Sequence, residues 1–161
     1  MIMRNTLAIL LGMALVGAAA STAPAQLLEK KTVSLAAAKK MAAAAEAEAA
    51  KNNWSMVISI FDDGGNLVDL ERMDGSQLAS IDISQAKGRT ALAFKRPPKA
   101  LQDTLNQGNP ALSTLPRLTA VQGGLPIVVD GNVIGAIGVS GGASAQDEQC
   151  AQAGLNALAG K

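Results

Sequence analysis

Apolar residues at helical spacing predict a first helix over residues 35–51, with one stripe of mostly small side chains facing a core. Ser34 stands at its N-cap position, where a hydroxyl can accept a backbone N–H. A segment rich in β-forming residues at 54–61 and an alternating one at 66–72 follow, with Asp62-Asp63-Gly64-Gly65 between them. The pattern therefore predicts a helix and then a β-hairpin with one polar face.

Helical spacing returns over residues 80–94 and ends before Pro97-Pro98. A second short helix can start at these prolines and end at Gly108, because proline suits the first turn of a helix and glycine suits the position after its last turn. Residues 109–115 are expected to form a loop.

Three short β segments are predicted at 118–122, 125–129 and 133–140. A last helix is expected with Ser144 as its N-cap and Asp147 at the third helical position. Tight hairpins imply antiparallel pairing, and helices precede and follow them in the chain. We therefore expect one α/β domain of the α+β type, with a five-stranded, mainly antiparallel sheet flanked by helices.

The glycine-rich stretch from Gly123 to Gly142 can be interpreted as a phosphate-binding loop or as part of the sheet. A phosphate loop needs successive N–H groups at a helix N-terminus, and no G-K-[ST] sequence follows here. Asp130-Gly131 is instead typical of a two-residue type I′ turn between strands. Gly141-Gly142 could bind an anion before the last helix, but ordinary capping by Ser144 and Asp147 is the favoured interpretation.

Residues 1–25 have the pattern of a signal peptide. Arg4 precedes the apolar run at 7–20, and Ala23-Pro24-Ala25 offers small residues at the spacing of a cleavage site. A retained anchor is the alternative, although the run is shorter than the roughly 20 residues that span a bilayer. We expect a cleaved leader, a periplasmic or secreted domain over 26–161, and no stable membrane span after cleavage.

Composition excludes several classes of function. The 14 basic and 13 acidic residues nearly balance and aromatic residues make up only 2%, so no nucleic-acid partner is expected. The chain has no His, which excludes Ser-His-Asp triads, Cys-His pairs and the commonest zinc ligand. The single Cys150 cannot form an internal disulfide and is expected to be buried. Lys95, Arg96 and Lys99 are interpreted as a solvated helix end.

A few residues could bind a ligand. Arg72, at the end of a predicted strand, can bind a carboxylate bidentately, with Lys87 and Thr90 one turn apart on the neighbouring helix. Lys87 falls among core positions, so it either snorkels or has an anionic partner. Gly135 and Gly138 make room in their strand for close packing, the favoured interpretation, or for a flat ligand.

Six separated segments carry a family resemblance. They are D-D-G-G-N-L-V at 62–68, R-M-D-G at 72–75, S-Q-A-K-G-R-T-A-L-A-F at 84–94, Gly123-Gly124 with Pro126, V-I-G-A-I-G-V-S-G at 133–141 and Q-D-E-Q-C-A-Q-A-G-L at 146–155. In this order they resemble the GlcG-like, haem-degrading domain family over nearly all of the chain after the leader. The resemblance implies a profilin-like fold, assembly into homo-oligomers, and an association with haem or a related tetrapyrrole.

Under this resemblance, Arg72, Lys87 and Arg117 can pair with haem propionates or with the carboxylate of a small hydroxy acid. Because the chain has neither His nor Tyr, only Met, Lys, Cys150 or a hydroxyl such as that of Thr90 could ligate the iron. The first hypothesis is a secreted protein that binds a planar, acidic small molecule. The alternatives are an enzyme of oxidative haem degradation or hydroxy-acid metabolism, and a ligand-free oligomeric assembly module.

Overall fold

The computed structural model describes residues 26–160, and the predicted signal peptide at 1–25 lies outside the described residues. In chain order the elements are α1 (Leu35–Lys51), β1 (Val57–Asp62), β2 (Leu67–Arg72), α2 (Ser80–Phe94), α3 (Pro98–Asn106), the 3₁₀ helix η1 (Pro110–Thr114), β3 (Gly124–Val129), β4 (Asn132–Ser140) and α4 (Ser144–Leu158). The predicted helices and both hairpins are confirmed, although η1 occupies most of the loop expected at 109–115. Among the helices of residues 26–160, none has the length and hydropathy of a membrane span.

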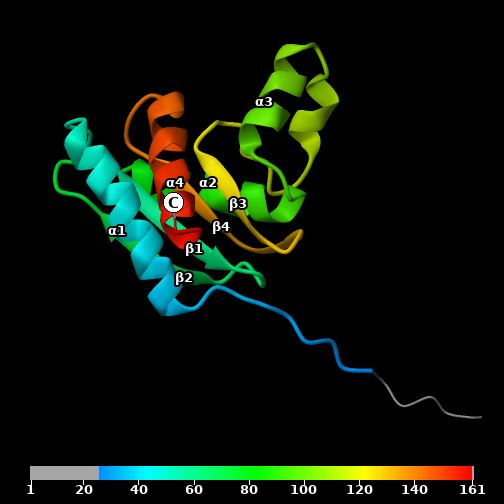
Figure 1. The fold of residues 1–161 in the computed structure, drawn as a ribbon. Helices are drawn as coiled ribbons and strands as arrows, with labels where there is room; N and C mark the ends of the chain where they lie inside the picture. The colour runs from blue at the N-terminus through cyan, green and yellow to red at the C-terminus, as the bar shows by residue number, and fades with distance from the viewer. Residues whose placement is uncertain (1–25, 161) are drawn as a thin grey trace, which may run out of the picture.

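Within residues 26–160, four strands form one sheet in the order β2-β1-β4-β3, and every neighbouring pair is antiparallel. α1 and α4 pack against each other on one face of the sheet, and α2 covers the other face (Figure 1). α3 and η1 project beyond the sheet. Asp130 and Gly131 have φ values of 50° and 75°, as the predicted type I′ turn between β3 and β4 requires. The α+β class and the antiparallel sheet are confirmed.

The prediction of a fifth strand at 118–122 is wrong, because this segment does not join the sheet. Thr90 on α2 holds it instead. The Thr90 Oγ1 accepts the N–H of Thr119 at 2.9 Å and donates to the carbonyl of Arg117 at 3.0 Å. The N–H of Val121 turns back to the carbonyl of Thr119 at 2.8 Å. Backbone groups that a strand would offer to its neighbour are therefore already bonded elsewhere.

The start of α4 differs by one residue from the prediction. Ala143 is the N-cap and Ser144 is the first helical residue, so capping by Ser144 is wrong. The Gln146 side chain accepts the N–H of Ala143 at 2.8 Å, and the Asp147 Oδ1 accepts the N–H of Gly142 at 3.0 Å. These N–H groups are bonded within the chain, as the capping interpretation of the glycine pair expected.

Glycines allow α2 to lie directly on β4. A Cβ added at Gly138 would be 2.5 Å from the amide nitrogen of Gly88 and closer still to the carbonyl oxygen of Ser84. At Gly135 an added Cβ would overlap the carbonyl oxygen of Phe61. The close-packing interpretation is confirmed at both positions, because protein backbone fills the space that a flat ligand would need there.

The main core lies between the sheet and the pair of helices α1 and α4. The two helices approach closely, since a Cβ added at Gly154 would lie 3.0 Å from the carbonyl oxygen of Met41. Cys150 is fully buried in this core, as predicted. Burial, followed by the charges of Glu48 and Asp147, raises the pKa of its thiol to about 11. The thiol is therefore protonated at neutral pH and is a poor nucleophile.

Candidate functional site

A groove of about 1210 Å³ opens beside the outer surface of α2. It lies between α2, the turns of both hairpins, the coil at 115–119 and the segment 29–31 before α1. Figure 1 shows the tips of both hairpins on the side where the described chain begins. The apolar part of its wall consists of Ala86, Leu92, Ala93, Leu115, Leu118, Val133 and Ile134. We call this feature the hairpin-tip groove.

Two ion pairs tie the segment before α1 to the hairpin turns along this groove. The Lys31 Nζ lies 2.5 Å from the Asp130 Oδ2, and the Lys30 Nζ lies 3.9 Å from the Asp63 Oδ2. The hydrogen bond and charge of Lys31 hold the pKa of Asp130 below its ordinary value. These pairs are solvent-exposed and contribute little stability. They occupy two of the three carboxylates that line the groove, the third being that of Glu29.

Three further cations line the groove. Arg89 donates to the carbonyl of Gly65 at 2.9 Å, and its guanidinium carbon lies 4.7 Å from the centre of the Phe61 ring. Among the described residues, the side chains of Lys95 and Arg117 have neither an ion-pair partner nor a hydrogen-bond partner. The groove therefore combines an apolar wall with two cations that are free to pair with an anion.

Backbone strain is concentrated at this groove. Among residues 26–160, the residues other than glycine with positive φ are Asn53, Lys95, Arg117 and Asp130. The last three of these line the groove. Lys95 ends α2 with φ 51° and ψ 34°, at a position where glycine is usual. Such conformations are unfavourable for residues with a side chain and are often retained at functional sites.

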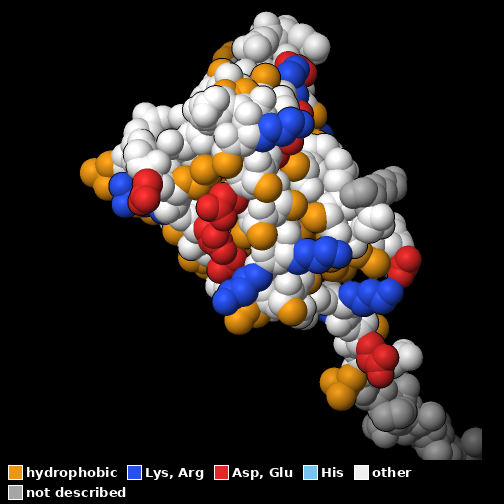
Figure 2. Space-filling view, turned by 60° about the vertical axis from the view of Figure 1, so that its left-hand side comes forward, with side chains coloured by type: hydrophobic (Ala, Val, Ile, Leu, Met, Phe, Trp, Pro, Cys, Tyr) orange, Lys and Arg blue, Asp and Glu red, His pale blue; other side chains and the backbone are white. Residues whose placement is uncertain are grey.

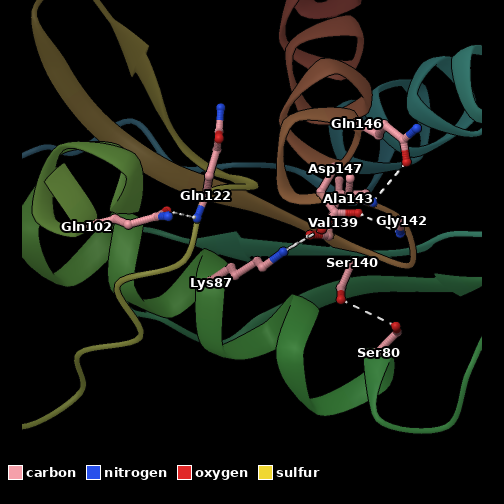
Figure 3. Close-up of polar contacts among 10 residues, drawn as sticks. All are labelled: Ser80, Lys87, Gln102, Gln122, Val139, Ser140, Gly142, Ala143, Gln146 and Asp147. Carbon is pink, nitrogen blue, oxygen red and sulfur yellow. Dashed lines mark hydrogen bonds and ion pairs between the residues drawn. The ribbon is translucent and has the colours of Figure 1, made fainter. Parts of the chain in front are cut away.

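Away from the groove, Lys87 and Asp147 form a buried ion pair (Figure 3). The Lys87 Nζ lies 2.6 Å from the Asp147 Oδ2 and 3.3 Å from the carbonyl oxygen of Val139, and both side chains are 2% exposed. A Cβ at Gly123 would lie 2.9 Å from the Nζ. Of the two alternatives expected for Lys87, snorkelling or an anionic partner, the structure shows the second. The pair joins α2 to α4 across β4.

A second set of polar contacts lies next to this ion pair and holds the coil before β3. The side chain of Gln102 on α3 accepts the N–H of Gln122 at 3.0 Å (Figure 3). The Gln122 side chain donates to the Glu148 Oε1 on α4 at 3.2 Å. Together with the bonds of Thr90, these contacts fix both ends of the coil that carries Arg117.

An acidic group of side chains lies on a different face. Figure 2 turns the α1 side toward the viewer and shows acidic side chains gathered there with basic ones beside them. Burial raises the pKa of Glu71 on β2, and the charges of Asp69 and Glu46 raise it further, against the effect of Lys39. Within the described residues, no three His, Cys, Asp or Glu side chains are arranged to hold a metal ion.

Comparison with known proteins identifies the family. Residues 33–156 match a family described as "Haem degrading protein HbpS-like". The chain belongs to the HbpS-like family. This agrees with the resemblance inferred from the sequence motifs. The predicted homo-oligomer of this HbpS-like chain stays a prediction.

Relatives of this HbpS-like chain agree in sequence and in structure. "Protein GlcG" of Escherichia coli K12 is 49% identical over 98 residues, which cover 61% of this chain and 73% of GlcG. Klebsiella pneumoniae protein ORFY has a crystal structure that superimposes with a TM-score of 0.78 at 35% identity, covering 84% of this chain and 97% of that chain. The crystal structure of a PduOC–heme complex superimposes with a TM-score of 0.71 at 28% identity, covering 78% and 94%.

The charged and hydroxyl residues singled out from the sequence lie in three places in this HbpS-like fold. Arg117 lines the groove, and Thr90 holds its coil through hydrogen bonds to the backbone of Arg117 and Thr119. Lys87 belongs to the buried ion pair. Arg72 is exposed at the end of β2 and does not line the groove. Ligand roles for Arg72 and Lys87 stay predictions.

Lys95 is a groove residue of this HbpS-like chain that the sequence did not reveal. The pattern places it with Arg96 and Lys99 at a solvated helix end, yet it has left-handed backbone at the end of α2 and lines the groove. A lysine directly before Arg96-Pro97, where a helix-ending glycine is usual, is the only indication that the sequence offers.

Proposed function

We propose that this HbpS-like protein binds a planar, acidic small molecule in the hairpin-tip groove, with haem or a related tetrapyrrole as the ligand. The observation that carries the proposal is the pair of unpartnered cations, Lys95 and Arg117, beside an apolar wall. The family description and a related protein crystallised with heme support the choice of ligand.

The chemistry of the groove suits both parts of such a ligand. Ligand pockets are commonly apolar clefts with a few polar groups that fix orientation. Leu92, Leu115 and Leu118 offer apolar surface to a flat ring. The planar guanidinium of Arg117 can bind a carboxylate through two parallel hydrogen bonds, and the Lys95 ammonium offers a point charge to a second carboxylate. Bound haem would supply a redox-active iron.

A titration with haemin tests the role of the two cations. We expect Arg117→Ala and Lys95→Ala each to raise the Kd about tenfold, because each removes one charge-assisted contact. Binding is followed by the shift of the haemin Soret absorption. Lys95→Gly should weaken binding equally while raising the free energy of unfolding by up to about 1 kcal/mol, because glycine adopts the left-handed backbone without strain.

The chain offers two controls for this titration. Arg96→Ala removes the same charge one residue from Lys95, but Arg96 does not line the groove, so its Kd should stay within about twofold of wild type. Arg72→Ala tests the alternative ligand contact on β2. A loss in Arg72→Ala or Arg96→Ala that matches the loss in Arg117→Ala would show that the groove is not the binding site.

We also propose that the protein is exported to the periplasm or secreted. The charged start, the apolar run at 7–20 and the small residues at 23–25 support export. N-terminal sequencing of the protein recovered from fractionated cells is expected to give a mature chain that starts near Gln26. Recovery of the intact N-terminus in the membrane fraction would instead support the retained anchor.

A further inference from the structure

The supply of iron ligands at the hairpin-tip groove sets a limit on how a tetrapyrrole can be held there. Among residues 26–160 the sulfur donors lie elsewhere: Cys150, Met41 and Met56 are fully buried in the core. The Sδ of Met73 packs against that core and accepts the N–H of Met56 at 3.4 Å. None of these residues lines the groove, and no His or Tyr exists in the chain.

Several oxygen and nitrogen donors near the groove are also occupied. The Thr90 Oγ1 is buried and already bonded to the backbone at both Arg117 and Thr119. The carboxylates of Asp63 and Asp130 are paired with lysines. The Glu29 carboxylate and the Thr119 hydroxyl line the groove as well, but they are not of the kinds that usually ligate haem iron. A lysine in its ammonium form has three donors and no lone pair, so it cannot ligate a metal.

The apolar wall and the two free cations of the groove match the ring and the carboxylates of a tetrapyrrole. The wall offers contact area to the ring whether or not it holds a metal, and Lys95 and Arg117 offer charge to the carboxylates. Neither kind of contact depends on iron. By contrast, a haem held by axial ligation derives much of its affinity and its spectrum from residues of the kinds that are absent from the groove.

We infer that the hairpin-tip groove binds a tetrapyrrole through its ring and its carboxylates and not through its iron, so that the metal-free porphyrin is as good a ligand as haem. The inference rests on the proposed function of the same groove. The groove then selects for a planar dicarboxylic acid, and the central metal has no protein ligand.

Three probes separate these contributions in direct titrations of the mature chain: haemin, metal-free protoporphyrin IX, and the dimethyl ester of protoporphyrin IX. We expect haemin and protoporphyrin IX to bind with Kd values within about threefold of each other. The dimethyl ester should bind about 100-fold more weakly, because both charge-assisted contacts are lost. Arg117→Ala should raise the Kd of the two acids by the same factor and leave the ester unchanged.

The electronic state of the bound iron gives a readout that does not depend on affinity. Without a protein ligand, bound ferric haem should show a high-spin electron paramagnetic resonance signal, with no low-spin signal from paired nitrogen or sulfur ligands. A low-spin signal, or haemin binding more than tenfold tighter than protoporphyrin IX, would overturn the inference while leaving the proposed function intact. Failure of all three probes to bind would overturn the proposed function and the inference together.

Discussion

Lys87→Met should lower the free energy of unfolding by about 3–5 kcal/mol, one of the two largest effects expected for a single substitution in this chain. The Asp147 carboxylate would stay buried and keep only the N–H of Gly142 as a partner. Asp147→Leu should be similarly destabilising, because it leaves the Lys87 ammonium buried with only the carbonyl of Val139. Urea unfolding followed by the fluorescence of the single Trp54 measures both.

The paired replacement is the decisive control. Lys87→Met combined with Asp147→Leu removes both charges, and its stability should lie within about 2 kcal/mol of wild type. Lys99→Met breaks an exposed pair with Asp103 and should change stability by less than about 1 kcal/mol. If Lys87→Met is no more destabilising than Lys99→Met, the buried pair does not hold α2 and α4 together.

The same variants test whether Lys87 binds the ligand. In the structure Lys87 is enclosed by Gly123, Val139 and Asp147 and does not line the groove. The paired variant should therefore bind haemin with a Kd close to that of wild type. A large loss of binding in a stable paired variant would instead support the ligand role predicted from the sequence.

The fold was predictable where local chemistry decides the structure. Ser34 caps α1 through a hydrogen bond to the N–H of Ala37 at 3.2 Å, and Asp130-Gly131 forms the predicted turn. The segment 118–122 was not predictable, because Thr90, 29 residues before Thr119, takes up its backbone groups. A side chain so distant in sequence leaves no mark on the local pattern that favours a strand.

The candidate site was also predictable only in part from the sequence. The place of Lys87 among core positions limited it to two alternatives, snorkelling or an anionic partner, since a buried charge needs a partner. The presence of both Lys95 and Arg117 in the lining of one groove did not follow, because both residues have left-handed backbone. Propensity assigns such backbone to glycine, so the sequence alone pointed away from this arrangement.

Gly138→Ala should also lower the free energy of unfolding by about 3 kcal/mol or more. The new methyl group would overlap the carbonyl oxygen of Ser84 and lie 2.5 Å from the amide nitrogen of Gly88. Both atoms belong to the backbone of α2, so no change of side-chain rotamer can relieve the overlap. The helix must move away from β4, and the bond between Ser59 and Ser84, 2.7 Å long and buried, would be strained as well.

A matched glycine separates this packing effect from the general effect of alanine on the unfolded chain. At Gly64, in the β1–β2 turn, the nearest atom to an added Cβ is the end of the Asn66 side chain, at 3.0 Å, and this side chain can move. Gly64→Ala should therefore change stability by less than about 1 kcal/mol.

The Gly138→Ala substitution should also disturb the groove, because α2 carries Thr90, which holds the backbone of Arg117. Gly138→Ala is thus expected to weaken haemin binding even at temperatures where the variant is folded. Stability equal to that of Gly64→Ala, together with haemin binding equal to that of wild type, would show that the contact between α2 and β4 is not tight.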